Sequence, residues 1–321
     1  MREKITVIFA GIVLAMLLPV GITMVMTGVM KEGTELSNHY ESGKTIMVDA
    51  VGEAKTLDLE TFLVQVLAAQ ISPDSEMESL KAQAVIARTT LRKQMADMTT
   101  IDSASLGMTY LTEAECKRQW GEKRYYTYLK RLQDAVIATM GQTITYDGEL
   151  IDALYHAVSM GNTISAMEAY GKEIPYLQSV ACSGDVESAS YMQVQTFTWD
   201  EMKIVLNTLA EDGKLNGFSL EACEQAALAE RIVVTEATEQ GYVKSVTIGG
   251  IVVAAEDFMV AAGLQSHIFY VEIIGEQIRV ICLGKGHGLG LSQYTANKMA
   301  VAGSNYEEIL TYFYPGAVVT P

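Results

Sequence analysis

Residues 284–294 decide the fold, and they read GKGHGLGLSQY. They follow an apolar run at residues 278–283 that is typical of a strand, and residues 292–302 have the pattern of a helix ended by Gly303. A glycine-rich turn between a strand and a helix lets the backbone come close to a ligand, because glycine lacks a β-carbon. We therefore expect His287 to face a ligand; a histidine packed between glycines is the alternative.

Two nucleotide-binding motifs do not fit this stretch. A P-loop requires Gly-Lys followed by Ser or Thr, and here Lys285 is followed by Gly286. A dinucleotide-binding fold requires a further array of strands and helices, whereas 31 residues follow Gly290. A glycan-binding edge and a tight packing turn remain as the two interpretations.

The chain is acidic and begins with a long uncharged segment. It has 321 residues, of which 49% are hydrophobic and 19% charged, and a formal net charge of −16. Nucleic acid and anionic lipid surfaces are poor partners for such a chain, because both require a basic footprint. Residues 5–30 carry no charge, and about 20 apolar residues suffice to cross a bilayer. No clear small-residue cleavage site follows, so we predict an uncleaved transmembrane anchor.

The charges before this segment predict its orientation. Arg2 and Lys4 favour a cytoplasmic N-terminus. We therefore expect a single-pass protein of the cell membrane with the bulk of the chain outside the cytoplasm. The predicted organisation is an anchor at residues 1–31, a polar spacer at 32–56 and one folded domain at 57–321.

The folded domain mixes helices with hairpins. Asp58 is placed to cap a helix that ends at Ser72-Pro73, and Ser75-x-x-Glu78 is a capping-box pattern that begins a second helix. Thr112-x-x-Glu115 opens a further helical region. Hairpins are predicted at residues 142–155, 242–254 and 268–283. Because these elements show no βαβ rhythm, we expect an α+β fold.

The four cysteines are Cys116, Cys182, Cys223 and Cys282. An exported domain can form disulfides, and four cysteines allow three connectivities. No Cys-x-x-Cys pair is present, so the sequence shows no closed zinc site. We expect no cofactor; zinc bound by Cys116 and Cys182 near His156 is the alternative.

One face of the second helix is basic. Lys81, Arg88 and Arg92 recur at helical spacing, opposite an apolar stripe that is expected to face the core. Such a basic face is either solvated or lines an anion-binding cleft.

Several segments, in order, resemble the stage II sporulation protein D family. Residues 80–89 read LKAQAVIART, residues 156–163 read HAVSMGNT, and residues 284–294 match the family's glycine-histidine signature, although Thr295 replaces its last glycine. Residues 174–177 (IPYL) and 312–316 (YFYPG) also fit. The resemblance implies a membrane-anchored peptidoglycan lytic transglycosylase of engulfment during sporulation. It would act on glycan strands stripped of stem peptides, beside a partner amidase.

One residue departs from the pattern where the reaction is defined. The implied reaction cleaves the bond between N-acetylmuramic acid and N-acetylglucosamine without water, and a single carboxyl group serves as acid and then as base. In the family this group is a Glu eleven residues before the helix Lys, which is Gln70 here. Glutamine can hydrogen-bond a sugar but cannot transfer a proton at neutral pH.

Three explanations are open. The domain has kept the cleft as a glycan-binding or amidase-activating module without catalysis. A nearby acid substitutes, and Asp74 and Glu76 are nearest, although Asp74 also fits a helix start and Glu76 the helix dipole. Otherwise Gln70 supports activity by another route.

The residues expected around one glycan-binding cleft come from both halves of the domain. Gln70 occupies the catalytic position, and Lys81 and Arg88 are expected to meet the lactyl carboxylate of muramic acid. The further substrate-binding candidates are His156, Ser159, His287, Gln293 and Tyr294.

Overall fold

The computed structural model describes residues 40–50 and 53–321. The predicted membrane anchor at residues 5–30 lies outside these described residues. Within them, none of the helices combines the length and the apolar character that crossing a membrane requires. Helices and several small sheets alternate along the chain, and the predicted α+β class is confirmed.

The chain divides into two compact units. The first holds the residues up to Asp74 together with Met95–Met140, and the second holds Ser75–Gln94 with Gly141–Pro321.

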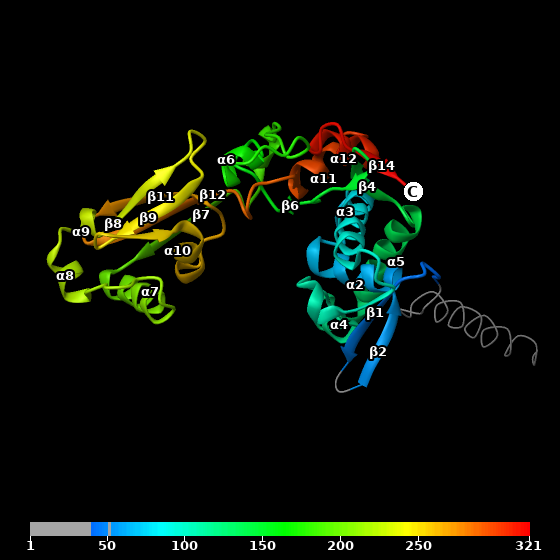
Figure 1. Ribbon diagram of the computed structural model, residues 1–321, viewed down its shortest axis with the longest axis horizontal. Coiled ribbons are helices and arrows are strands. Elements are labelled where there is room, and N and C mark those ends of the chain that lie inside the picture. Colours follow the sequence, from blue (N-terminus) through cyan, green and yellow to red (C-terminus); the bar gives the residue numbers. More distant parts are fainter. Residues whose placement is uncertain (1–39, 51–52) are drawn as a thin grey trace, which may run out of the picture. The chain divides into compact units, whose positions relative to one another are not determined.

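The first unit packs a small sheet against helices (Figure 1). Strands β1 (Thr45–Ala50) and β2 (Glu53–Asp58) form an antiparallel pair, and β3 (Thr100–Asp102) lies parallel to β1 on its other side. A short 3₁₀ turn, η1 (Ser103–Leu106), follows β3. The helices are α2 (Leu59–Gln70), α4 (Glu113–Trp120) and α5 (Glu122–Ala138).

Two helix starts of this unit are as predicted. The Asp58 side chain accepts a hydrogen bond from the Glu60 amide at 2.8 Å, and Thr112 with Glu115 makes a complete capping box for α4. The expected spacer differs, because β1 and most of β2 fall within residues 32–56. Ile46 and Val48 of this stretch are buried, but so short an alternation gives a weak sequence signal.

The described residues of the second unit form two large hydrophobic cores and a small buried cluster of Ile164, Tyr242 and Ile268. The first core lies around α3 (Met77–Met95) and elements from the middle and end of the chain. These are β4 (Thr143–Tyr146), β5 (Glu149–Leu150), β6 (Tyr155–His156), α6 (Ala166–Tyr170), η2 (Ser183–Glu187), β13 (Leu291–Ser292), α11 (Gln293–Val301), α12 (Tyr306–Phe313) and β14 (Val318–Thr320). The sheet order β14-β4-β5 confirms the hairpin at Asp147-Gly148.

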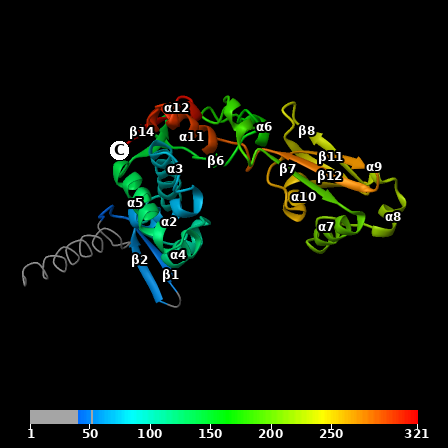
Figure 2. The same cartoon turned by 180° about the vertical axis from the view of Figure 1, so that it is seen from behind.

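The other core is built by residues 192–283. Its elements are β7 (Met192–Phe197), α7 (Trp199–Glu211), α8 (Leu220–Gln225), α9 (Leu228–Arg231), β8 (Ile232–Ala237), β9 (Val243–Ile248), β10 (Ile251–Ala254), α10 (Ala255–Ala262), β11 (Ile268–Ile274) and β12 (Gln277–Leu283). The sheets have orders β10-β9-β8 and β11-β12-β7, and the predicted hairpins at 242–254 and 268–283 are confirmed. Figure 2 shows these strands from behind, with α7 and α10 below them. Strand β12 leads directly into the glycine-rich turn.

Candidate functional site

In the first unit, a pocket of about 390 Å³ surrounds the end of α2. Helix α2 ends at Gln70, where Ile71 turns to an extended conformation and donates its amide to the Leu67 carbonyl at 3.1 Å. The pocket is lined by Ala68, Ala69, Gln70, Ile71, Ser72, Pro73, Asp74, Gln119, Trp120, Arg124 and Tyr128. The residue at the position of the family Glu therefore lines an open pocket, where its amide can both donate and accept hydrogen bonds.

Side chains of α5 donate hydrogen bonds to the loop that follows α2. The Tyr128 hydroxyl donates to Asp74 Oδ2 at 2.6 Å, and Arg131 Nε donates to the Pro73 carbonyl at 2.8 Å. The Trp120 and Tyr128 rings meet edge to face at 5.6 Å, and the Arg124 guanidinium lies 5.6 Å from the Tyr128 ring centre. The wall thus combines aromatic surface, one cation and one carboxylate.

In the second unit, the two sequence motifs pack against each other. Strands β6 and β13 pair in parallel, with Leu291 opposite Tyr155 and Ser292 opposite His156. The Lys285 amide donates to the Val158 carbonyl at 2.6 Å, and the Val158 amide donates back to the Lys285 carbonyl at 3.1 Å. The glycine-rich turn is thereby bound along the 156–163 segment.

The glycines of this turn are required by contacts within the protein. A β-carbon on Gly290, whose φ is +68°, would lie 1.9 Å from the Leu154 carbonyl oxygen. A β-carbon on Gly286 would lie 2.8 Å from that of His156. The glycines are predicted to let the backbone come close to a ligand, but here they let it come close to the protein's own Leu154 and His156. This favours the tight packing turn, and a ligand at the turn stays a prediction.

His156 and His287 lie side by side, with ring centres 6.0 Å apart. His156 is buried and its Nδ1 bonds the Leu289 carbonyl at 3.0 Å, so Nδ1 carries the proton. Burial lowers the pKa of His156 to about 4, and among the described residues its Nε2 has no hydrogen-bond partner. His287 Nδ1 instead accepts from the Leu289 amide at 3.1 Å, and burial lowers the pKa of His287 too. Both rings are neutral at pH 7.

A buried carboxylate that sequence reasoning missed joins the two motifs. Asp185, in η2, is fully buried and accepts three hydrogen bonds. Its donors are the Ser159 amide at 2.5 Å, the Ser292 hydroxyl at 2.7 Å and the Thr295 hydroxyl at 2.6 Å. Ser292 also caps α11. Asp185 belongs to no motif or element that the sequence predicted, so no local pattern pointed to it.

Gln293 and Tyr294 begin α11 beside this carboxylate. Gln293 Nε2 donates to Gln83 Oε1 on α3 at 3.2 Å, and the Tyr294 amide donates to the Ala157 carbonyl at 3.1 Å. The Lys298 ammonium lies 5.6 Å from the Tyr294 ring centre. Five predicted site residues therefore cluster in the second unit: His156, Ser159, His287, Gln293 and Tyr294. We call them the motif cluster.

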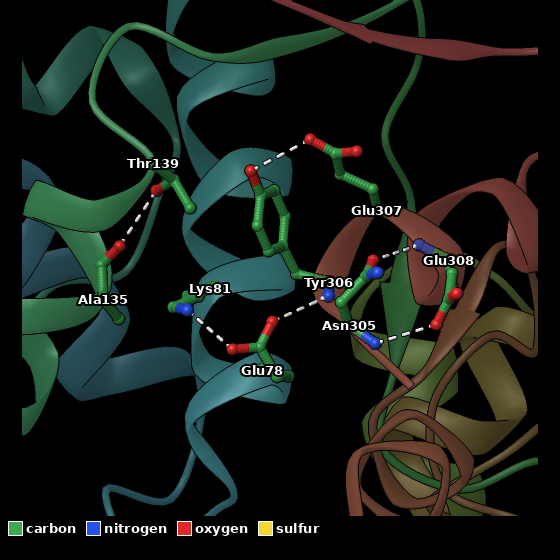
Figure 3. A network of polar contacts seen from close by, with 8 residues as sticks. All are labelled: Glu78, Lys81, Ala135, Thr139, Asn305, Tyr306, Glu307 and Glu308. Carbon is green, nitrogen blue, oxygen red and sulfur yellow. Dashed lines mark hydrogen bonds and ion pairs between the residues drawn. The ribbon is translucent and has the colours of Figure 1, made fainter. Parts of the chain in front are cut away.

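Lys81 on α3 is already paired. Its ammonium contacts Glu78 Oε1 at 2.6 Å, and Glu78 Oε2 accepts the Tyr306 amide at 2.9 Å, as Figure 3 shows. The Lys81 ammonium also lies 5.8 Å from the Tyr306 ring centre. A sugar carboxylate would have to compete with Glu78 for this cation.

Arg88, in contrast, is part of the core. Its side chain is fully buried, and Nη1 donates to the Gln142 carbonyl at 3.2 Å. The basic residues of α3 thus form neither a continuous solvated face nor a continuous cleft wall. Direct contact between Arg88 and a glycan stays a prediction that its buried position does not favour.

The eight predicted site residues fall in both units. Gln70 belongs to the first, and Lys81, Arg88 and the five residues of the motif cluster belong to the second. A cleft that unites them stays a prediction.

The cysteines are free thiols, and all four are buried. Burial raises the pKa of both Cys116 and Cys182 to about 11. Within residues 40–50 and 53–321, no group of three or more His, Cys, Asp and Glu side chains is arranged to hold a metal ion.

Comparisons with known proteins agree with these motifs. A family model described as "Stage II sporulation protein" matches residues 48–146. Stage II sporulation protein D of Bacillus subtilis (strain 168) is 31% identical over 93% of this chain and 84% of its own length. Its counterpart from Bacillus amyloliquefaciens is 28% identical over 83% of this chain and 75% of its own length. An amidase enhancer of Bacillus subtilis (strain 168) is 27% identical over 76% of this chain and 38% of its own length.

The chain therefore belongs to the stage II sporulation protein D family.

Proposed function

We propose that this protein processes peptidoglycan during sporulation by binding glycan strands that have lost their stem peptides. The observation that carries the proposal is the pocket at the end of α2, which has Gln70 at the position of the family Glu. Its aromatic, amide and charged groups are suited to a sugar polymer that carries carboxylates. We further propose that residues 5–30 anchor the protein in the cell membrane and that the rest lies outside the cytoplasm.

Lytic transglycosylase activity is the reaction that we propose for this pocket. It yields 1,6-anhydromuramic acid ends, because the C6 hydroxyl of the sugar takes the place of water. Gln70 cannot supply the proton that this reaction needs, so the activity requires a carboxyl group elsewhere in the pocket.

A second candidate function is favoured by the same glutamine. A pocket that binds bare glycan without cleaving it could hold strands for a partner amidase. The similarity to a protein named as an amidase enhancer supports this alternative.

The test uses the purified full-length chain and peptidoglycan stripped of stem peptides. Co-sedimentation measures binding, and mass spectrometry detects 1,6-anhydro ends. Gln70→Glu is compared with Gln133→Glu, which adds the same charge on α5 at a residue that does not line the pocket. Binding together with anhydro ends from the unaltered chain supports the transglycosylase. Binding with anhydro ends from Gln70→Glu alone supports the binding module, and absence of binding refutes both.

A further inference from the structure

The pocket at Gln70 contains a carboxyl group. Asp74 lies four residues beyond Gln70, and among the described residues that line the pocket it is the only Asp or Glu. Because Gln70 cannot transfer a proton, any acid–base chemistry in this pocket depends on another side chain.

We propose that Asp74 is the catalytic acid and base of this chain, in place of the glutamate that the family carries at position 70. The inference rests on the proposed glycan-processing function and names the residue that would perform it.

The structure positions this carboxyl group firmly. The Tyr128 hydroxyl donates to Oδ2 at 2.6 Å, which leaves Oδ1 without a hydrogen bond from the described residues. The preceding carbonyl, that of Pro73, accepts from Arg131 at 2.8 Å. Tyr128 and Arg131 lie one helical turn apart on α5, so a single helix fixes the loop. A catalytic group oriented by a second side chain is the usual arrangement of a general acid or base.

Tyr128 is suited to this orienting role. Its hydrogen bond to Asp74 raises the pKa of the Tyr128 phenol, so the phenol stays protonated and continues to donate. One carboxylate oxygen is thereby held, and the other can exchange a proton with a bound sugar.

The proposed reaction consumes neither water nor any co-reactant. Asp74 Oδ1–H gives its proton to the oxygen that links C1 of N-acetylmuramic acid to C4 of N-acetylglucosamine. The C1–O bond breaks, its electron pair stays on that oxygen, and the N-acetylglucosamine end leaves as an alcohol. The Asp74 carboxylate then takes the proton of the C6 hydroxyl while O6 bonds to C1. The products are a 1,6-anhydro end and a reprotonated Asp74.

The other nearby acid does not share this position. The Asp74 and Glu76 side chains are both exposed, but Glu76 does not line the pocket, and its backbone amide donates to Asn297 Oδ1 at 2.7 Å. Glu76→Gln therefore serves as a matched control that removes one carboxylate two residues away.

The experiment measures anhydro-end formation and glycan binding for four forms of the full-length chain. These are the unaltered chain, Asp74→Asn, Glu76→Gln and the double variant Asp74→Asn/Gln70→Glu. Asparagine keeps the size of the side chain and can still accept the Tyr128 hydroxyl bond. We expect Asp74→Asn to lower the rate by about 10²- to 10⁴-fold with binding retained, because general acid–base catalysis contributes a factor of this size. Glu76→Gln should react as the unaltered chain does, and the double variant should recover activity.

Three results would overturn the assignment. The first is an Asp74→Asn rate within a few-fold of the unaltered rate. The second is an unaltered chain that binds stripped glycan without forming anhydro ends, which leaves the binding function standing. The third is the absence of glycan binding, which refutes the proposed function as well and is distinguished by the co-sedimentation readout.

Discussion

Replacing Gly290 with alanine should break the contact between the two motifs. Gly290 has φ +68°, and a β-carbon there would lie 1.9 Å from the Leu154 carbonyl oxygen. That oxygen accepts hydrogen bonds from the Leu291 amide at 3.0 Å and from the buried Tyr314 hydroxyl. To clear the new methyl group, the backbone must separate by more than an ångström, and at least the Leu291 bond is lost.

The magnitude follows from two contributions. A left-handed conformation costs a residue other than glycine about 1–2 kcal/mol. A lost hydrogen bond that leaves a buried group unpaired costs about 1–3 kcal/mol more. We therefore expect Gly290→Ala to lower the free energy of unfolding of this core by roughly 2–5 kcal/mol, within the range of strongly destabilising substitutions.

Gly171 provides a matched control. Its φ is also +68°, but a β-carbon there meets nothing within 4 Å. Gly171→Ala should therefore cost only the conformational part, about 1–2 kcal/mol. Amide hydrogen exchange of peptides covering residues 154–164 and 284–295 measures the difference locally. Fast exchange in both peptides is expected for Gly290→Ala alone. Equal protection in the two variants would refute the close packing at Gly290.

Three further predictions concern buried polar groups of the second unit. The pKa of His156 is about 4 in the folded protein, against 6.5 for an ordinary histidine, so acid favours the unfolded chain. The free energy of unfolding, measured by urea titration, should therefore fall by about 2 kcal/mol between pH 8 and pH 5. A His156→Gln variant whose free energy of unfolding changes equally with pH would contradict this. Asp185→Ala leaves three hydrogen-bond donors unpaired, so calorimetry should show a loss of at least about 3 kcal/mol in the free energy of unfolding. Glu187→Ala, at an exposed ion pair, should cost under about 1 kcal/mol. Similar losses for the two variants would show that Asp185 does not join the motifs. Arg88→Met removes the hydrogen bond to the Gln142 carbonyl, so it should lower the melting temperature. The folded variant should still co-sediment with stripped glycan as the unaltered chain does. Weakened co-sedimentation would show instead that Arg88 contacts the glycan.

Local signals in the sequence predicted local structure well. Asp58 and the Thr112–Glu115 box satisfy amides a few residues away, and such contacts depend only on neighbouring residues. The turn at Asp147-Gly148 has positive φ at both residues, 50° and 84°, as a tight hairpin requires.

Contacts between distant segments could not be predicted in the same way. Strands β6 and β13 are two residues long and lie more than a hundred positions apart, so neither gives a periodic signal. Asp185 accepts hydrogen bonds from Ser159 and from Ser292 and Thr295, which belong to two other segments of the chain.

The basic stripe of α3 shows a further limit. Helical spacing groups Lys81 with Arg88, but almost every side chain from Ser79 to Thr89 is buried. When a helix is covered on all sides, periodicity does not tell which polar residue faces a ligand.

Hydrogen-exchange footprinting of the full-length chain with stripped glycan strands tests the central claim most directly. If bare glycan occupies the pocket at Gln70, peptides covering residues 68–74 and 119–128 should gain protection when strands are added. Protection of residues 284–294 as well would support the predicted single cleft. Strands that bind while residues 68–74 and 119–128 exchange at unchanged rates would contradict the claim that this pocket holds the glycan.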